Sequence, residues 1–481
     1  MTLSIPKIIQ GGMGAGVSNW RLAQAVSRLG QLGVVSGTGL DHILVRRLQE
    51  GDPGGDTRRA LSHFPFPKLV QYILDNYFIP GGKPASAPYR NFGPHTVEGK
   101  RVPQELCIAA NFVEVFLARE GHSNPVGINY LEKIQLPHLP SIYGAMLAGV
   151  SVVIMGAGIP LEIPGVLDAL VNHECVSYPV HVTTPAHGGE VFRMVFDPRD
   201  FHENNITLAS LQRPAFLPIV SSDVLATMMI RRVTGSIQGF IIEGPLAGGH
   251  NAPPRGKLQL SASGEPVYGP RDDVNLEAFR NMKYPFWLAG AYGSPAKLAA
   301  ALTQGATGIQ VGTAFALCKE SGLVPAFRRT LVQKALDGKA EIFTDPLASP
   351  TGFPFKVAKL EGTLSDPTLY HQRQRLCDLG FLREVYRKAD GSIGYRCPAE
   401  PVESYVAKGG KLEDTENRKC LCNALIANIG YPQHFKDGGQ ELPMITLGDD
   451  VINIGQFCKS GNPDYTAADV IQTLLGNSAL S

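Results

Sequence analysis

Short apolar runs rich in β-branched residues recur along the first two-thirds of the chain, and each ends in glycine or a small polar residue. Segments with helical spacing lie between several of them, for example "NWRLAQAVSRLG" and "SPAKLAAALTQG". This alternation of strand and helix patterns predicts a parallel sheet. The eight apolar runs are "KIIQGGMG" (7–14), "LGVVSGTG" (32–39), "PVGINYLE" (125–132), "VSVVIMGAG" (150–158), "AFLPIVSS" (215–222), "GFIIEG" (239–244), "FWLAGAYG" (286–293) and "GIQVGTAF" (308–315).

Eight strand-helix units favour a (β/α)8 TIM barrel, an α/β fold whose chemistry sits on loops at the carboxyl ends of the strands. A doubly wound open sheet is the competing architecture, but it usually carries one glycine fingerprint after its first strand. Here small residues follow nearly every strand. We therefore predict a barrel over 1–320 with a long insertion at about 41–124, after strand two. A mixed, mostly helical C-terminal region over 321–481 is expected to pack on it.

Composition narrows the class of protein. The chain has 481 residues, 44% of them hydrophobic and 18% charged, with a formal net charge of +1. These values indicate a globular protein, and the absence of a long basic run argues against nucleic acid as a partner. Eight cysteines without a CxxC pair, and no secretory signal, indicate a reduced, cytoplasmic protein.

One uncharged stretch is long enough to cross a bilayer, because no Asp, Glu, Lys or Arg stands between Lys133 and Glu162. Its prolines and glycines at turn-like positions fit a short helix followed by a buried strand better. We therefore expect no membrane association. The expected partner is a small-molecule substrate; the oligomeric state stays open, with a homodimer as one alternative.

The loops after strands seven and eight are candidates for binding phosphate. Strand seven ends in Gly290-Ala291 and strand eight in Gly312-Thr313. The two ends are neighbours in a barrel, where such loops commonly form a phosphate site. Small residues let backbone N–H groups approach phosphate oxygens, and a helix N-terminus adds a favourable dipole. The alternative is that these residues only make turns.

The first strand runs into "GGMGAGVS", in which Gly12, Gly14 and Gly16 alternate. The spacing departs from G-x-G-x-x-G, and no acidic residue clearly ends strand two, so a nicotinamide-binding Rossmann unit is disfavoured. A flat ring lying along the backbone at a barrel mouth fits better. Met13 would supply a soft apolar contact there, or would simply belong to the core.

His250 follows two glycines at the end of strand six, in "GFIIEGPLAGGHNAPPRG". With an unperturbed pKa near ~6.5, a histidine can exchange a proton at neutral pH. A lone loop histidine is more often a structural hydrogen-bonding residue, but its position at a strand's carboxyl end favours catalysis. Asn251 and Arg255 either bind an anionic substrate group or cap the Pro-Pro turn.

Four cysteines gather late in the chain, and four thiolates can hold zinc or an iron–sulfur cluster. Their spacing matches no zinc-ribbon pattern, and "KCLCNALIANIG" also reads as the start of an apolar helix. No metal is therefore the main expectation, with this set as the alternative. The four are Cys377, Cys397, Cys420 and Cys422.

Four of these segments, taken in order, resemble the nitronate monooxygenase family, also called 2-nitropropane dioxygenase-like, whose relatives include flavin-dependent enoyl reductases. They are "IIQGGMGAGVSNWRLAQAVSRLGQLGVVSG", "VGINY", "GFIIEGPLAGGH" and "LAGAYGSPAKLAAALTQGATGIQVGTAF". The resemblance covers the barrel strands and much of 1–320, and touches "SPTGFPFKV" at 349–357. It implies a TIM barrel that binds FMN, with His250 as the catalytic residue.

The resemblance also implies which residues hold the flavin. The ring would pass along the first loop and contact the strand-three asparagine, with a weaker match on strand five. The glycines before the histidine would lie by the ribityl and phosphate side, and the last two strand ends would hold the phosphate. The residues are Gly12, Met13, Gly14, Asn129, Ser221, Gly248, Gly249, Gly290, Ala291, Gly312 and Thr313.

Departures from the family pattern concern the substrate more than the cofactor. Ala291 stands where a phosphate-site glycine is usual, and "QGGM" lacks the usual proline before the methionine. The insertion and the C-terminal region exceed the family core. Three functions remain open: oxidation of alkyl nitronates with O2, reduction of an enoyl thioester with NAD(P)H, and a non-catalytic flavin-binding or scaffold role.

Overall fold

The computed structural model of the chain describes residues 6–184, 189–203, 206, 208–459 and 462–476. Eight parallel strands form one sheet in the order β1-β10-β9-β8-β7-β4-β3-β2. A parallel bridge between Ile9 and Leu32 joins the two strands at the ends of this order, so the sheet closes on itself. The predicted (β/α)8 barrel is confirmed, because an open sheet would keep two unpaired edges.

All eight barrel strands lie within the apolar runs predicted from the sequence. Their buried side chains alternate between two cores: Ile9, Ile241 and Trp287 belong to a small core inside the barrel, whereas Ile8 and Val153 pack outward against helices. Burial on both faces explains why the strands read as continuous apolar runs. The strands are β1 (Ile8–Gln10), β2 (Gly33–Ser36), β3 (Val126–Leu131), β4 (Val152–Gly156), β7 (Ala215–Val220), β8 (Phe240–Glu243), β9 (Phe286–Ala289) and β10 (Gly308–Val311).

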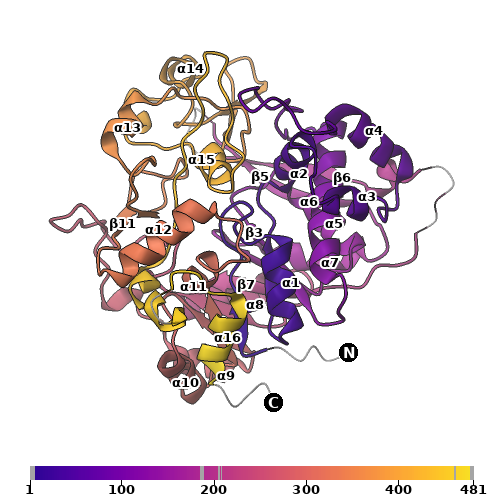
Figure 1. The fold of residues 1–481 in the computed structure, drawn as a ribbon. Helices are drawn as coiled ribbons and strands as arrows, with labels where there is room; N and C mark the ends of the chain where they lie inside the picture. The colour runs from indigo at the N-terminus through magenta and orange to yellow at the C-terminus, as the bar shows by residue number, and fades with distance from the viewer. Residues whose placement is uncertain (1–5, 185–188, 204–205, 207, 460–461, 477–481) are drawn as a thin grey trace.

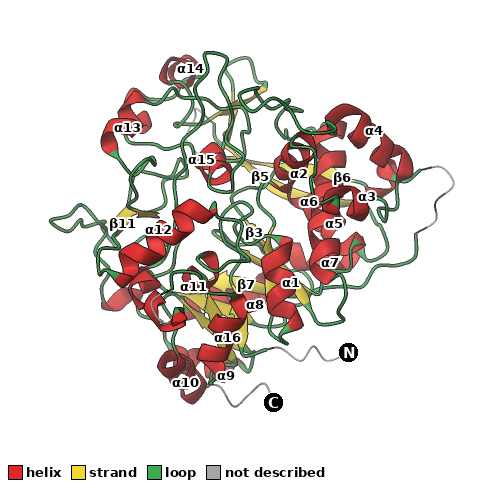
Figure 2. Cartoon of the chain, in the orientation of Figure 1, coloured by secondary structure: helices red, strands yellow, loops and turns green. Residues whose placement is uncertain are grey.

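Helices connect the strands and surround the barrel (Figure 2). Side-chain caps fix where several of them begin: Asn19 accepts a hydrogen bond from the Leu22 N–H, and Ser294 accepts one from the Lys297 N–H. These helices are α1 (Trp20–Arg28), α5 (Arg101–Arg119), α6 (His138–Leu147), α7 (Ile163–Leu170), α8 (Asp223–Arg232), α9 (Leu276–Met282), α10 (Pro295–Thr303) and α11 (Thr313–Ala316), with the 3-10 turns η1 (Pro198–Phe201) and η2 (Pro270–Asp272).

The long connection between β2 and β3 is largely helical. It contains α2 (Leu40–Gln49), α3 (Asp56–Leu61) and α4 (Pro67–Tyr77), and α5 then returns the chain to β3. Figure 1 shows these helices on one side of the barrel. A hairpin of β5 (Val176–Val182) and β6 (Glu190–Phe196) precedes β7.

The uncharged stretch between Lys133 and Glu162 resolves into α6 and β4, as predicted. Among the described helices, none combines the length and apolar character that crossing a bilayer requires.

After α11 the chain forms helices and two antiparallel hairpins joined by long loops. Part of this region, around α13 and α14, lies apart from the barrel helices in Figure 1, whereas α15 places Ile426 next to Gly39 and α16 packs against α1. The elements are α12 (Pro325–Leu336), β11 (Ile342–Asp345), β12 (Phe355–Ala358), α13 (Pro367–Gln372), β13 (Glu384–Arg387), β14 (Ile393–Arg396), α14 (Val402–Ala407), η3 (Leu412–Thr415), α15 (Leu421–Ala427), η4 (Asp449–Phe457) and α16 (Ala467–Leu475).

Pairing of β1 with β10 requires a glycine at position 308, because a Cβ there would lie 2.0 Å from the Lys7 carbonyl oxygen. We expect Gly308→Ala to lower the free energy of unfolding by about 2 kcal/mol, within the range of overpacking substitutions. Gly269→Ala is the matched control, since Gly269 has a φ of −138° and a Cβ added there would meet no heavy atom within 4 Å. Urea unfolding measures both, and equal midpoints for the two variants would contradict the close approach.

Candidate functional site

A cleft of about 1520 Å³, counting its open mouth, lies at the carboxyl ends of the barrel strands. The C-terminal region supplies a further wall through Phe355, Phe381, Leu421 and Thr446. The sequence assigned none of these side chains to the site, and only the segment 349–357, which contains Phe355, shared the family resemblance. Each of the eight strands contributes at least one residue at or just beyond its end. Examples in strand order are Gly11, Ser36, Asn129, Gly156, Ile219, Glu243, Ala289 and Gly312.

Most residues predicted for the site line this cleft. They come from β3 and from the loops after four other strands, all far apart in the sequence, and the closed barrel brings them to one place. They are Gly12, Met13, Gly14, Asn129, Gly248, Gly249, His250, Gly290, Ala291, Gly312 and Thr313.

Three predicted residues are not part of the lining. The Ser221 carbonyl accepts a hydrogen bond from the exposed Arg255 side chain at 2.7 Å, and that guanidinium also donates to the Arg271 carbonyl. Asn251 is buried and donates through Nδ2 to the Ala247 carbonyl at 3.0 Å. Arg255 and Asn251 therefore fix the loop after β8, which is the structural alternative considered for them.

The loop after β1 packs closely against β3. A flat ring could lie against the surface that the two form together. A Cβ on Gly12 would lie 2.4 Å from Asn129 Cβ, and Asn129 Nδ2 donates to the Gly12 carbonyl at 3.1 Å. The other amide atom, Asn129 Oδ1, is buried without a hydrogen-bond partner. Ser18 holds the loop in place, because its hydroxyl accepts the Met13 N–H. An unpartnered acceptor at this wall fits a ligand that carries a ring N–H.

The ends of β9 and β10 present backbone donors. Gly290 has a φ of 94° and Ala291 a φ of 59°, so this turn is left-handed. Among the described residues, the N–H groups of Ala291 and Gly312 have no hydrogen-bond partner, whereas Gly290 stands at the end of the β9–β10 ladder. Unpaired donors of this kind suit an anion such as phosphate.

An acidic side chain lies at the same rim. Asp450 is buried, and its Oδ2 accepts the Gly293 N–H at 2.9 Å while Oδ1 accepts Asn453 Nδ2, also at 2.9 Å. These bonds spread the carboxylate's charge over two donors, which reduces its repulsion of a bound anion.

His250 is held by two contacts from the C-terminal region. Its Nε2 lies 2.7 Å from Ser349 Oγ, and its ring meets the Phe355 ring edge-on at 4.9 Å between centroids. Burial, together with the nearby charge of Lys133, lowers the pKa of His250 to about 3. His250 is therefore neutral at pH 7 in the free protein. The prediction that its pKa lies close enough to 7 for proton exchange does not agree with this burial.

Two titratable residues near the cleft were missed. Burial raises the pKa of Glu243, the last residue of β8, to about 7. Burial also lowers the pKa of Lys133 to about 8, against the opposing effect of Glu132. The sequence could have identified Glu243, because it is a carboxylate at the end of an otherwise apolar strand. A side chain at that position reaches the barrel mouth.

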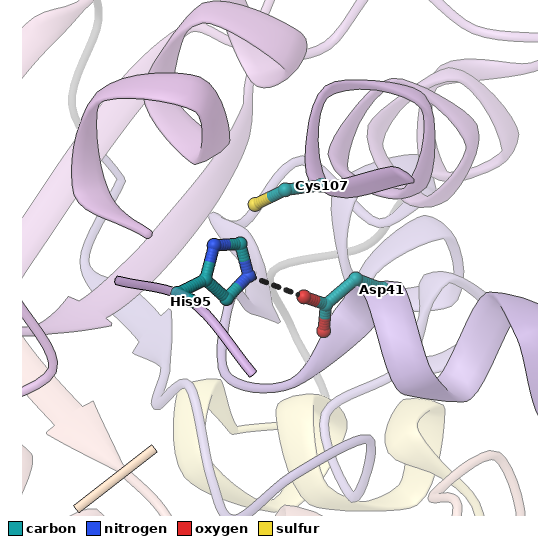
Figure 3. A group of neighbouring side chains, drawn as sticks. All are labelled: Asp41, His95 and Cys107. Carbon is teal, nitrogen blue, oxygen red and sulfur yellow. Dashed lines mark hydrogen bonds and ion pairs between the residues drawn. The ribbon is translucent and has the colours of Figure 1, made fainter. Parts of the chain in front are cut away.

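A second buried group of side chains lies beside the cleft (Figure 3). His95 Nε2 is 2.7 Å from Asp41 Oδ2, and Cys107 Sγ is 2.9 Å from Ser141 Oγ. Although burial opposes ionisation, the hydrogen bond with His95 lowers the pKa of Asp41, whereas burial raises the pKa of the Cys107 thiol. The thiol is thus neutral and bonded to Ser141, and the Asp41–His95 pair links α2 to the loop before α5.

Comparison with known proteins supports the sequence resemblance. Residues 202–345 match the family model described as nitronate monooxygenase, which confirms the resemblance for that segment. No curated protein matches the chain significantly.

Similar solved structures include FabK from Thermotoga maritima, with 16% identity, a TM-score of 0.47, and coverage of 98% of this chain and 91% of that one. A nitroalkane oxidase from Streptomyces ansochromogenes has 14% identity and a TM-score of 0.45, covering 98% and 95%. The enoyl reductase domain of MlnA from Bacillus amyloliquefaciens has 13% identity and a TM-score of 0.43, covering 98% and 94%.

The left-handed conformation at Ala291 gives a test of the β9 turn, because an L-residue there is strained by roughly 1–2 kcal/mol. We expect Ala291→Gly to raise the free energy of unfolding by about 1 kcal/mol after the entropic penalty of glycine. Ala289→Gly, in the strand just before the turn, should instead lower it. Thermal unfolding compares the two, and a destabilised Ala291→Gly protein would contradict the assigned turn.

Proposed function

We propose that this chain is an FMN-dependent oxidoreductase, most like a nitronate monooxygenase that oxidises alkyl nitronates with O2. The observation that carries the proposal is one cleft in which unpaired backbone donors, a glycine-lined wall and His250 meet. The family match over 202–345 supports it, because that segment contains His250 and both candidate phosphate loops.

The residues present fit FMN. Gly12, Met13 and Gly14 would lie along the ring, with Asn129 Oδ1 as an acceptor for a ring N–H. Gly248 and Gly249 would face the ribityl chain. Gly290 would let the phosphate approach the backbone, and the N–H groups at 291 and 312 would bind it, with Thr313 at the start of the short helix α11. Bound FMN would supply the electron transfer.

His250 would act as a hydrogen-bond donor and not as the base. This role requires the tautomer with the ring proton on Nδ1, in which Nε2 accepts from the Ser349 hydroxyl. Nδ1 has no partner among the described residues and is free to donate. A group with a pKa of about 3 is too weak a base to take a proton from carbon at neutral pH. The preferred substrate is therefore the preformed nitronate anion, whose charge Lys133 would also attract.

Reduction of an enoyl thioester by NAD(P)H is the second candidate. Two observations favour it: Glu243, with a pKa of about 7, can give a proton to carbon, and Phe381, Leu421 and Leu425 form an apolar wall suited to an acyl chain. His250 would then donate a hydrogen bond to the thioester carbonyl. The third candidate is a flavin-binding protein without turnover.

Anaerobic mixing separates the three candidates. Bleaching of the flavin absorbance by an alkyl nitronate but not by NADPH is expected for the proposed function. Rapid bleaching by NADPH, with turnover of an enoyl thioester, would favour the reductase. A yellow protein that reacts with neither would support the non-catalytic role.

Removing the His250 imidazole should abolish most turnover and leave FMN bound. We expect His250→Ala to lower kcat by about 10²-fold or more, which is the loss typical of one preorganised donor. Ser349→Ala should cost less, because it only frees the ring to rotate. His371→Ala, at an exposed position, is the matched control. Undiminished turnover of His250→Ala with intact flavin absorbance would exclude the assigned role.

Glu243 predicts a pH dependence. Its carboxyl is neutral below a pKa of about 7 and anionic above it. An anion next to an anionic substrate is repulsive, and an ionised acid cannot donate, so kcat/KM should fall as pH rises through about 7. Glu243→Gln should remove this step, whereas Glu277→Gln, at an exposed site, should keep it. An unchanged profile in Glu243→Gln would assign the step to another group.

A further inference from the structure

The four late cysteines converge, although they come from three separate segments of the chain. Cys397 and Cys420 are buried with Ala399, and Cys377 and Cys422 pack against them. Apart from the Ala399 methyl group, every side chain of this small core is a thiol. None of the four is in a disulfide.

Three of the four cysteines lie in loops, and Cys422 is the second residue of α15. Cys377 lies between α13 and β13, Cys397 directly follows β14, and Cys420 directly precedes α15. Four thiols and one methyl group bury little apolar area, so hydrophobic burial alone holds these segments together weakly. Cores of this size are commonly held together by a metal centre.

The cysteine cluster has a polar neighbour that can hold a sulfur ligand in place. Asn423 Nδ2 donates a hydrogen bond to Cys420 Sγ at 3.9 Å, and the Asn423 side chain is itself buried. N–H donors to sulfur are a usual feature around a cysteine-bound metal centre.

The distances between the sulfur atoms distinguish a zinc ion from an iron–sulfur cluster. Four thiolates around one zinc at ~2.3 Å would lie about 3.8 Å apart. Within the described part of the chain, no three of these sulfur atoms lie within 4.8 Å of one another. In an iron–sulfur cluster with several iron atoms, the cysteines bind different irons and stand further apart.

We infer that Cys377, Cys397, Cys420 and Cys422 bind an iron–sulfur cluster. The cluster would adjoin the cleft, because Leu421 and Cys422 line it. Its presence does not depend on the proposed function.

Metal and sulfide analysis of the full-length chain, purified without oxygen, tests the inference. Iron and acid-labile sulfide in equal amounts are expected, with an electron paramagnetic resonance signal after reduction by dithionite. Cys397→Ser and Cys420→Ser should lose most of both, whereas Cys175→Ser, at an exposed cysteine, should keep them. Zinc in place of iron, no metal after reconstitution with iron and sulfide, or full iron content in both serine variants would overturn it.

The wild-type chain decides the question even if a serine variant does not fold, since iron with sulfide supports the cluster and zinc or no metal overturns it. Flavin content, measured on the same sample, reports separately on the proposed function. A protein with iron and sulfide but no flavin would support the cluster and contradict the proposed function. A protein with flavin but without iron and sulfide would contradict the cluster and leave the proposed function intact.

Discussion

Closure of the parallel sheet is the constraint on which the site depends. β1 pairs with β10 along Ile8 to Gln10 and meets β2 at the bridge between Ile9 and Leu32, so eight strand ends are held in one ring. Gly308 permits the close pairing with β10. Without closure, the first loop, the loop before His250 and the turns at 290 and 312 would not face a common cleft.

Within that ring, burial determines which side chains carry a charge. Removal from water disfavours the charged form of each group. His250 is therefore neutral, the pKa of Glu243 rises to about 7, and the pKa of Lys133 falls to about 8. The same burial strengthens any hydrogen bond that His250 makes to a substrate oxygen. A neutral donor beside a cationic lysine suits an anion that arrives already deprotonated, and this is the reason that the nitronate, and not its parent nitroalkane, is the proposed substrate.

The strands and their glycine-rich ends were predictable, because parallel strands buried on both faces leave continuous apolar runs and their ends mark the mouth. The wall made by Phe355 and Leu421 was not, since long-range packing leaves no local pattern. The pKa of His250 depends on that wall and on Lys133, so it could not be read from residue type. For a similar reason the sequence could not decide between the two roles considered for Arg255, whose guanidinium binds carbonyl groups of its own surroundings. The convergence of the cysteines likewise required the fold, because their spacing matches no known ribbon.

The central claim is that the cleft binds FMN, and the chromophore released from the purified protein tests it most directly. Denaturation should release a stoichiometric amount of a fluorescent flavin that co-elutes with FMN, and the protein should show the absorption bands of an oxidised flavin beforehand. A protein that releases no flavin and fails to bind added FMN would contradict the account.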